Sequence, residues 1–402
     1  MPKAIFLCID GGDPAYLEAA ETPTLDRLRE SGSFAIVQAQ VPTVTNVNNV
    51  SIITGSPPSA HGITANYYYD PADGSEVYME SAAFLLAPTA LQRARAAGLK
   101  TALLASKSKL CQLLGEGAEV VVSGEEPPAW AVERAGPRED IYSGAVNVWL
   151  LRALAAAIEL HRPDVIYCST TDYIPHKYGP TEAAAQEHMR ELDAALARVL
   201  DLWDHPIYIT ADHGMNDKSR MVDAGLLLAR AGIAAEVVPI IKDRYVLHHG
   251  NQGGAAYVHL RDRAALGDAA GALREVAGIE EAYPREEAAS AFDLHPGRIG
   301  DLLLLADRDT VFGQGGRAGT GPLPESLSLG APLGRWGLRG TGSPAAAGAA
   351  EAPVALRSHG SKHELSVPLF ARPAPPRPMR SHMDPVRFFL AELGEDPGRV
   401  AS

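Results

Sequence analysis

Short apolar runs recur along the first half of the chain at residues 4–9 (AIFLCI), 101–105 (TALLA), 163–168 (PDVIYC) and 206–211 (PIYITA). They lack a clean alternation of apolar and polar positions, as expected for strands that are buried on both faces of a sheet. Segments with helical spacing lie between them. One such segment places on a single stripe Met189, Leu192, Leu196, Val199 and Trp203. The pattern predicts an α/β core with a mostly parallel central sheet flanked by helices.

Turn and cap residues add two helices to this core. Thr22 and Pro23 mark the start of one helix and Gly32 its end. A final helix, FFLAEL, is bracketed by Asp384, Pro385 and Gly394.

The pattern changes after residue 217, where an alanine-rich helix precedes YVLHHG and the strand-like AAYVHL. We interpret residues 218–297 as a smaller inserted α+β cap, and residues 1–217 and 298–402 as the core, which resumes at Leu302 (LLLLA). Positions 313–348 contain eleven glycines and four prolines. Because such a composition does not sustain a regular element, we expect a mobile loop over 313–352.

Composition narrows the classes of function. The chain has 402 residues, 46% of them hydrophobic, which is enough for a large core. A net charge of -13 without a cluster of Lys and Arg argues against nucleic acid as a partner. The three cysteines, Cys8, Cys111 and Cys168, form no CxxC pair and are expected to be reduced. No apolar stretch approaches ~18 residues, so we expect no membrane partner and a cytoplasmic location. The sequence is compatible with a homodimer but does not decide the oligomeric state.

Acidic residues and histidines follow several of the predicted strands. Asp10 precedes two glycines after the first run, and Asp212 and His213 directly follow PIYITA. Asp172 and His176 are four residues apart in STTDYIPHKYGP, where Pro175 predicts a distorted turn. The carboxyl ends of parallel strands converge at one sheet edge, so these side chains can meet there. Carboxylates with imidazoles suit zinc or a similar ion, although each motif alone also fits an ordinary turn or a surface pair.

A hydroxyl and a further histidine extend this set. Thr45, in PTVTNVNNVSIITG, is placed to cap a helix, whose free amides could stabilise charge developing during an attack by that hydroxyl. An ordinary cap is the alternative. His359, in LRSHGSKHELSVPLF, is preferred over His363 because Gly360 permits a close approach to a site.

Three more residues could bind an anion. Lys107 and Lys109 in SKSKL would share a face if the preceding strand continued, although surface lysines are the plainer interpretation. Asn66, in HGITANYYYD, is a candidate donor to a phosphoryl oxygen. His249, in the predicted cap, could approach the same site, but we assign it no role.

Taken together, the motifs resemble the alkaline phosphatase superfamily, in the branch of nucleotide pyrophosphatases/phosphodiesterases and phosphonoacetate hydrolases. In the order that this family uses, the chain carries FLCIDGGDP, ETPTLDRLRESG, PTVTNVNN, TGSPPSAHGI, TTDYIPHKYGP, ITADHGMND and RSHG. The resemblance implies an alkaline phosphatase-like fold and two zinc ions, with manganese or iron as alternatives. It also implies that paired metals clamp the attacking and leaving oxygens while Thr45 forms a phosphothreonine intermediate.

The same resemblance assigns the metal ligands. One ion is held by Asp10, Thr45, Asp212 and His213. The other is held by Asp172, His176 and His359.

Within the branch, the similarity is to the phosphonoacetate hydrolases, through TTDYIPHKYGP, HGITANYYYD and SKSKL. Phosphodiesterases typically carry an aromatic residue after the nucleophile, where this chain has Asn46. The resemblance implies a small anionic phosphonate as substrate and cleavage of its C–P bond. Lys107 and Lys109 would bind the carboxylate and stabilise the enediolate, while Asn66 would hold the phosphonate. A phosphodiesterase or phosphomonoesterase that uses the same metals is the alternative, and the chain departs from the family in an enlarged loop at 313–352.

Overall fold

The computed structural model describes residues 2–313, 320–322, 356–375 and 377–395. The predicted mobile loop at 313–352 therefore lies outside the described residues, except for Gly313 and residues 320–322. In the described part of the chain, no helix is both long enough and apolar enough to cross a membrane.

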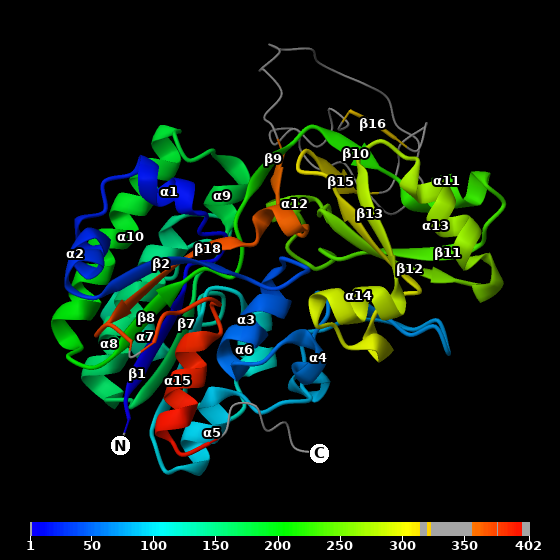
Figure 1. Ribbon diagram of the computed structural model, residues 1–402. Helices are drawn as coiled ribbons and strands as arrows, with labels where there is room; N and C mark the ends of the chain where they lie inside the picture. Colours follow the sequence, from blue (N-terminus) through cyan, green and yellow to red (C-terminus); the bar gives the residue numbers. More distant parts are fainter. Residues whose placement is uncertain (1, 314–319, 323–355, 376, 396–402) are drawn as a thin grey trace.

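The main sheet has seven strands in the described part, in the order β2-β18-β8-β1-β7-β5-β6. Figure 1 labels β2, β18, β8, β1 and β7 of this sheet. Their bounds are Ala4–Cys8 (β1), Ser33–Gln38 (β2), Thr101–Ala105 (β5), Val120–Ser123 (β6), Val165–Ser169 (β7), Ile207–Thr210 (β8) and Ser366–Arg372 (β18). The pairs from β8 through β6 are parallel, whereas β18 runs antiparallel to β8 and β2. The predicted α/β class with a mostly parallel sheet is confirmed.

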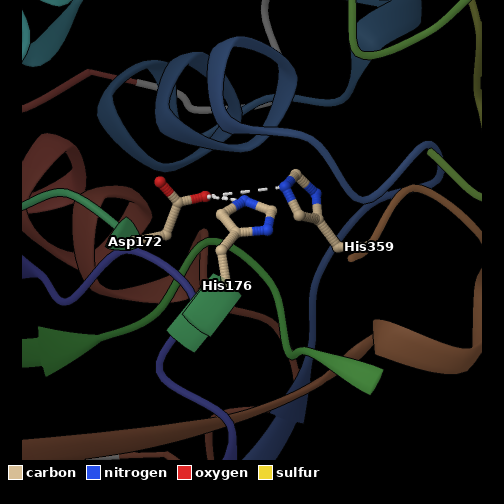
Figure 2. A group of neighbouring side chains, drawn as sticks. All are labelled: Asp172, His176 and His359. Carbon is tan, nitrogen blue, oxygen red and sulfur yellow. Dashed lines mark hydrogen bonds and ion pairs between the residues drawn. The ribbon is translucent and has the colours of Figure 1, made fainter. Parts of the chain in front are cut away.

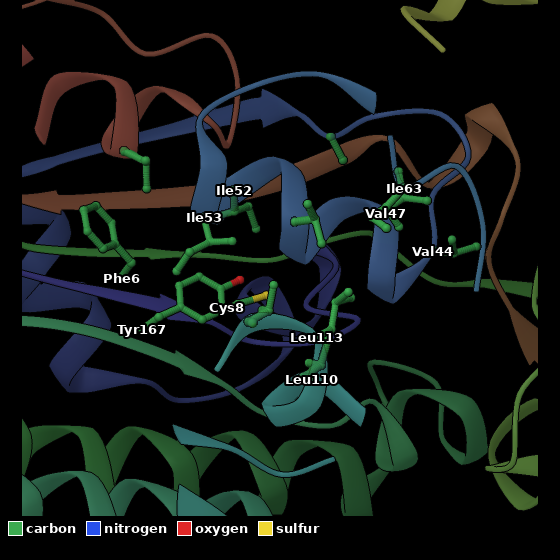
Figure 3. Packing of buried hydrophobic residues seen from close by; sticks show 14 of the residues in the cluster. Phe6, Cys8, Val44, Val47, Ile52, Ile53, Ile63, Leu110, Leu113 and Tyr167 are labelled. Carbon is green, nitrogen blue, oxygen red and sulfur yellow. The ribbon is translucent and has the colours of Figure 1, made fainter. Parts of the chain in front are cut away.

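Helices cover both faces of this sheet, and alternate residues of β1 point to opposite sides. Phe6 and Cys8 join one cluster, together with side chains of α3, α5, α6 and α15 (Figure 3). Ile5 and Leu7 join the other, with side chains of α2, α7, α8 and α10. These helices span Thr45–Thr54 (α3), Ala90–Ala96 (α5), Ser108–Leu114 (α6), Asp384–Glu392 (α15), Pro23–Ser31 (α2), Ala129–Ala135 (α7), Ala145–His161 (α8) and Ala183–Leu202 (α10). Burial on both faces explains why these strands read as unbroken apolar runs.

A second sheet, in the order β11-β12-β14-β13, is antiparallel throughout. Its strands are Ala235–Pro239 (β11), Ala255–Leu260 (β12), Ile279–Pro284 (β13) and Leu302–Ala306 (β14), accompanied by the helices Ala224–Arg230 (α11), Leu266–Arg274 (α13) and Arg285–Phe292 (α14). Our expectation that the core resumes at Leu302 is wrong, because β14 pairs with β12 and β13. The second sheet and its helices form a smaller unit. Leu302 and Leu304 face a cluster within this smaller unit, while Leu303 and Leu305 join the main cluster. A strand buried on both faces is not distinguishable by pattern from a strand of the main sheet.

Shorter helices and strands complete the described part of the chain. They are Pro14–Ala19 (α1), Pro58–His61 (α4), Tyr67–Tyr69 (β3), Glu76–Tyr78 (β4), Tyr173–Lys177 (α9), Asn216–Lys218 (β9), Arg220–Val222 (β10), Val246–His249 (α12), Thr310–Phe312 (β15), Thr320–Pro322 (β16) and Leu356–Ser358 (β17). Two of these elements, α9 and α12, carry histidines discussed below.

The start of α2 is held by a neighbouring helix. Thr22 occupies the N-cap position, but its side chain makes no capping hydrogen bond within the described residues. Instead, the buried carboxylate of Asp193 on α10 accepts from the backbone N–H of Thr24 (2.9 Å to Oδ2) and of Leu25 (2.9 Å to Oδ1). This contact joins two helices on the same face of the sheet.

Replacing Asp193 with alanine is expected to lower the free energy of unfolding by about 1–3 kcal/mol, because two buried amide donors lose their acceptor. The urea midpoint of unfolding measures the loss. Asp201→Ala, at an exposed position of the same helix, is the matched control. An unchanged midpoint for Asp193→Ala would show that water satisfies the two amides equally well.

Candidate metal centre and active site

Four neighbouring strands of the main sheet are each followed, at their carboxyl ends, by residues of the candidate site. Asp10 follows β1 and Asp172 follows β7. Asp212 and His213 come after β8, and Lys107 comes after β5. The order β8-β1-β7-β5 makes these strand ends adjacent, so residues separated by up to 203 positions in sequence meet at one edge.

Asp172, His176 and His359 form one group, in which the candidate ligand atoms all lie within 4.8 Å of one another (Figure 2). The Asp172 Oδ2 atom is 3.0 Å from His176 Nε2 and 3.5 Å from His359 Nε2. His363, the competing histidine, is instead paired with Glu280 of the smaller unit. The structure therefore brings His359, not His363, to this group.

The segment after Asp172 is more regular than its proline suggests. We expected a distorted turn, but Tyr173–Lys177 forms the short helix α9, and the N–H of His176 donates to the Asp172 carbonyl (3.1 Å). Pro175 lies in the first turn, where a backbone N–H has no intrahelical partner to lose. Asp172 and His176 consequently face the same side of the helix.

Asp10, Asp212 and His213 form a second group, again within 4.8 Å. His213 Nε2 is 3.4 Å from Asp10 Oδ1 and 3.6 Å from Asp212 Oδ2. The two groups adjoin, because the rings of His213 and His359 stack with centroids 3.6 Å apart. Lys107 lies between them and donates to Asp10 Oδ2 (2.9 Å) and Asp172 Oδ1 (2.8 Å).

The three histidines are held in the tautomer that a metal requires. Each Nδ1 lies against a backbone carbonyl, of Arg357 for His176 (2.7 Å), of Gly214 for His213 (3.0 Å) and of Thr43 for His359 (2.6 Å). A carbonyl only accepts, so each Nδ1 carries a proton, and each Nε2 faces the other members of its group, where a metal would bind it.

Several buried atoms in these groups lack an ordinary partner. Asp10 Oδ1, His213 Nε2 and His359 Nε2 make no hydrogen bond with any described residue. Buried polar atoms without partners are costly, and a bound cation would satisfy all three. Mixed carboxylate and imidazole donors suit a divalent metal such as zinc, so the residues fit the metals that the sequence resemblance implies.

The charges of the site also favour bound cations. Burial and the nearby Asp172 and Asp212 raise the pKa of Asp10 well above its ordinary value. Burial is also the main cause that raises the pKa of Asp212 to about 6. Burial opposes ionisation of Asp172, yet Lys107 and His176 outweigh it and hold that pKa well below normal. Lys107 pairs with Asp10 and Asp172, and divalent cations would compensate the remaining charge of the three carboxylates.

Thr45 is the first residue of α3, after Val44 at the N-cap position, so our expectation that Thr45 caps the helix is off by one residue. Thr45 is buried. One turn later, Asn49 Nδ2 donates to the Thr45 carbonyl (3.0 Å) and to Asp212 Oδ2 (3.1 Å). Tyr167 fixes the amide by donating to Asn49 Oδ1 (2.8 Å). Asn49, which sequence reasoning missed, thus links the helix of Thr45 to one ligand group.

The local structure around the two lysines differs from the continuing strand that we expected. β5 ends at Ala105 and α6 begins at Ser108, so the two lysines do not share the face of a continuing strand. Both are nevertheless buried, and Lys109 donates to Asp243 Oδ2 (2.5 Å). Asn66 Nδ2 donates to the same oxygen (3.2 Å). Lys109 and Asn66 are therefore brought together by one carboxylate.

Sequence reasoning missed Asp243 itself and assigned no role to its neighbour His249. Asp243 follows the apolar run VVPII, which is its one weak signal. His249, for which we had no role, lies 3.2 Å from Asp243 through Nε2. His248 Nε2 pairs with Thr171 Oγ1 (2.9 Å) and lies 3.9 Å from Asp172 Oδ1.

With this fold and site, the chain belongs to the type I phosphodiesterase / nucleotide pyrophosphatase family, whose model matches residues 4–323. Among solved structures, it is similar to phosphonoacetate hydrolase from Sinorhizobium meliloti 1021 in complex with phosphonoformate, with 32% identity and a TM-score of 0.82 over 97% of this chain and 95% of that chain. The complex of the same enzyme with phosphonoacetate gives 31% identity and a TM-score of 0.83 with the same coverage. The resemblance stated from the motifs is confirmed.

More distant relatives share parts of the chain or the fold alone. Venom phosphodiesterase from Naja atra is 27% identical over 230 residues, which are 52% of this chain and 26% of the venom protein. The match thus spans about a quarter of that relative's length. Murine ectonucleotide pyrophosphatase/phosphodiesterase 5 shares the fold, with a TM-score of 0.66 at 16% identity over 99% of this chain and 96% of that chain.

Proposed function

We propose that the protein hydrolyses the C–P bond of phosphonoacetate to give acetate and phosphate. The observation that carries the proposal is the buried Lys109, placed with Asn66 beside two groups of metal-ligating side chains. The similarity to the Sinorhizobium meliloti phosphonoacetate hydrolase supports the same substrate. A small anionic substrate agrees with the buried ammonium groups. A cytoplasmic location and a homodimer stay predictions.

Two zinc ions fit the two groups, with manganese or iron as alternatives. We assign one ion to Asp10, Asp212, His213 and Thr45, and the other to Asp172, His176 and His359. Bound there, the ions would supply positive charge for the phosphonate oxygens and would favour ionisation of a neighbouring hydroxyl.

The chain's own residues then account for the reaction. The Thr45 oxygen, after loss of its proton, forms a bond to phosphorus while the C–P bond breaks and its electron pair passes to carbon. The leaving group is the enediolate of acetate, and it takes up a proton to become acetate. Water then hydrolyses the phosphothreonine, releases phosphate and restores Thr45. The first amides of α3 are placed to stabilise negative charge at phosphorus.

The two lysines have different partners, so we assign them different roles. Lys107 already donates to Asp10 and Asp172, so it adds positive charge between the two ligand groups. We assign Lys109 to the substrate carboxylate, whose negative charge grows as the C–P bond breaks. Asn66 holds the phosphonate, because its amide lies between Asp243 and the backbone N–H of Asn46, next to the nucleophile.

Lys109→Ala is expected to lower kcat/KM for phosphonoacetate by about 100-fold, because a buried charged partner of the substrate is lost. Cleavage of an aryl phosphate ester, which has no carboxylate, should fall far less. Release of phosphate and of the aryl alcohol measures the two reactions. Lys100→Ala, at an exposed lysine just before β5, is the control. Equal losses on both substrates would remove the proposed role of Lys109.

The family match favours a second candidate, a phosphodiesterase or phosphomonoesterase that uses the same ligands and Thr45. Asn46, where phosphodiesterases typically carry an aromatic residue, offers no ring against which a base could stack. Phosphate release should be compared across phosphonoacetate, phosphonoacetaldehyde, phosphonopyruvate and aryl phosphates. If the wild type releases no phosphate from phosphonoacetate but cleaves the esters, this second function replaces the first.

A further inference from the structure

The buried carboxylate of Asp243 is the common partner of the residues that we assign to the substrate. Its Oδ2 atom accepts from the Lys109 ammonium at 2.5 Å and from Asn66 Nδ2 at 3.2 Å. Its Oδ1 atom accepts from the backbone N–H of Tyr245 at 2.8 Å and lies 3.2 Å from His249 Nε2. One side chain between β11 and α12 thus ties the smaller unit to both substrate-side residues of the core.

The contacts of His249 and Asn66 settle which atoms donate to Asp243. His249 Nδ1 accepts from the N–H of Asn251 (3.0 Å), so the ring proton is on Nε2 and points at Asp243. Burial lowers the pKa of His249 and keeps the ring neutral. Asn66 Oδ1 accepts from the N–H of Asn46 (3.2 Å), which turns Nδ2 towards Asp243. The carboxylate therefore receives four donors.

Because all four donors hold the Asp243 carboxylate in place, Asp243 stays bonded to Lys109 and Asn66 when a substrate binds. The side chain is only 3% exposed. Burial alone would raise the pKa of Asp243, but Lys109 and His249 hold it well below its ordinary value. Releasing the carboxylate would leave a buried charge and several donors unpaired, which is costly.

The Lys109 ammonium still has N–H groups for a ligand while it is bonded to Asp243. A lysine ammonium has three N–H donors, and within the described residues Asp243 is the one hydrogen-bond partner found for this ammonium. Two N–H groups are thus available to a substrate carboxylate. Without Asp243, the buried ammonium would lose both its compensating charge and its fixed place.

We propose that Asp243 is a positioning residue that sets selectivity for a phosphonate bearing a carboxylate. It fixes the Lys109 ammonium and the Asn66 amide at the spacing that receives the two ends of such a substrate. The inference rests on the proposed function and adds the residue that makes the site select its substrate class.

The test compares two ligands that differ in the carboxylate alone, phosphonoacetate and methylphosphonate. Zinc-loaded Thr45→Ala protein, which is expected to turn over far more slowly than the wild type, serves as the parent, and calorimetry gives the two dissociation constants. Adding Asp243→Asn is expected to weaken phosphonoacetate binding by about 30-fold, as for loss of a buried charged partner, and to leave methylphosphonate binding nearly unchanged. Asp301→Asn is the matched control, because Asp301 is a buried carboxylate that pairs with Arg285 within the smaller unit.

Methylphosphonate binding also reports whether the variant folds. If Asp243→Asn does not fold, His249→Ala replaces it, since that change removes one donor and keeps the carboxylate. It should give a smaller loss, again confined to phosphonoacetate. In either variant, equal weakening of both ligands would show a merely structural role and overturn the inference.

Two further outcomes separate the inference from the proposed function. Unchanged or tighter binding of phosphonoacetate by Asp243→Asn, in a parent that prefers phosphonoacetate, overturns the inference alone. A parent that binds both ligands equally overturns the proposed substrate, and the role of Asp243 with it.

Discussion

Thr45→Ala is expected to lower kcat for phosphonoacetate by at least about 10⁴-fold, as loss of a covalent nucleophile does elsewhere. Thr45 is buried at the first turn of α3, and Asn49 ties its backbone to Asp212. Loss of the hydroxyl removes the atom that bonds to phosphorus, whereas the histidines and carboxylates of both ligand groups remain. Phosphate release measures the loss, and metal analysis shows whether the ions stay bound.

Two matched variants sharpen this experiment. Thr45→Ser keeps a hydroxyl and should retain part of the activity. Thr54→Ala, at the opposite end of the same helix, removes a hydroxyl that bonds to the Val50 carbonyl and should leave kcat almost unchanged. Substantial turnover by Thr45→Ala with both metals bound would show that water attacks phosphorus directly.

Removal of divalent metals is expected to abolish activity and to lower the melting temperature, and zinc should restore both. Asp10, Asp172 and Asp212 lie buried together, and Lys107 pairs with the first two, so the folded state gains when cations bind. A ligand at 100 times its dissociation constant stabilises a fold by about 2.7 kcal/mol per site. Thermal unfolding with and without a chelator measures the shift, and elemental analysis after zinc loading should find two metals per chain.

Magnesium is the informative control for this experiment, because it prefers oxygen ligands and should stabilise the protein much less than zinc. Asp10→Asn with Asp212→Asn should leave one metal per chain. If zinc neither binds nor raises the melting temperature, the two groups are ion-paired clusters and not metal sites.

Residues that follow a strand were the easiest to anticipate from the sequence. Asp10, Asp172, Asp212 and His213 each follow a buried strand of a parallel sheet, so their meeting at one edge follows from topology. The structure brings them together as expected, and it also places His359 with them. Their roles as metal ligands are a proposal for the experiments above.

What escaped the sequence depends on contacts between distant segments. The strand Leu302–Ala306 has the same apolar pattern as a main-sheet strand, and its partners β12 and β13 decide where it lies. Asp243 lies outside the motifs, and Asn49 lies in PTVTNVNN without a role that the motif assigns; the importance of both residues follows from what they contact. The lysines were found through a wrong local geometry, since a helix starts where we expected a strand to continue.

Thr43 has a consequence for how this family can change. Its carbonyl accepts from His359 Nδ1 (2.6 Å), and its hydroxyl accepts from the N–H of Gly360 (2.9 Å) and donates to the Ser361 carbonyl (2.7 Å). The last candidate ligand is thereby fastened to the segment leading into Thr45, about 316 positions earlier in the chain. Sequence inserted before β17 need not displace His359. Related proteins can therefore carry a longer segment before β17 while this histidine keeps its position beside the other candidate ligands.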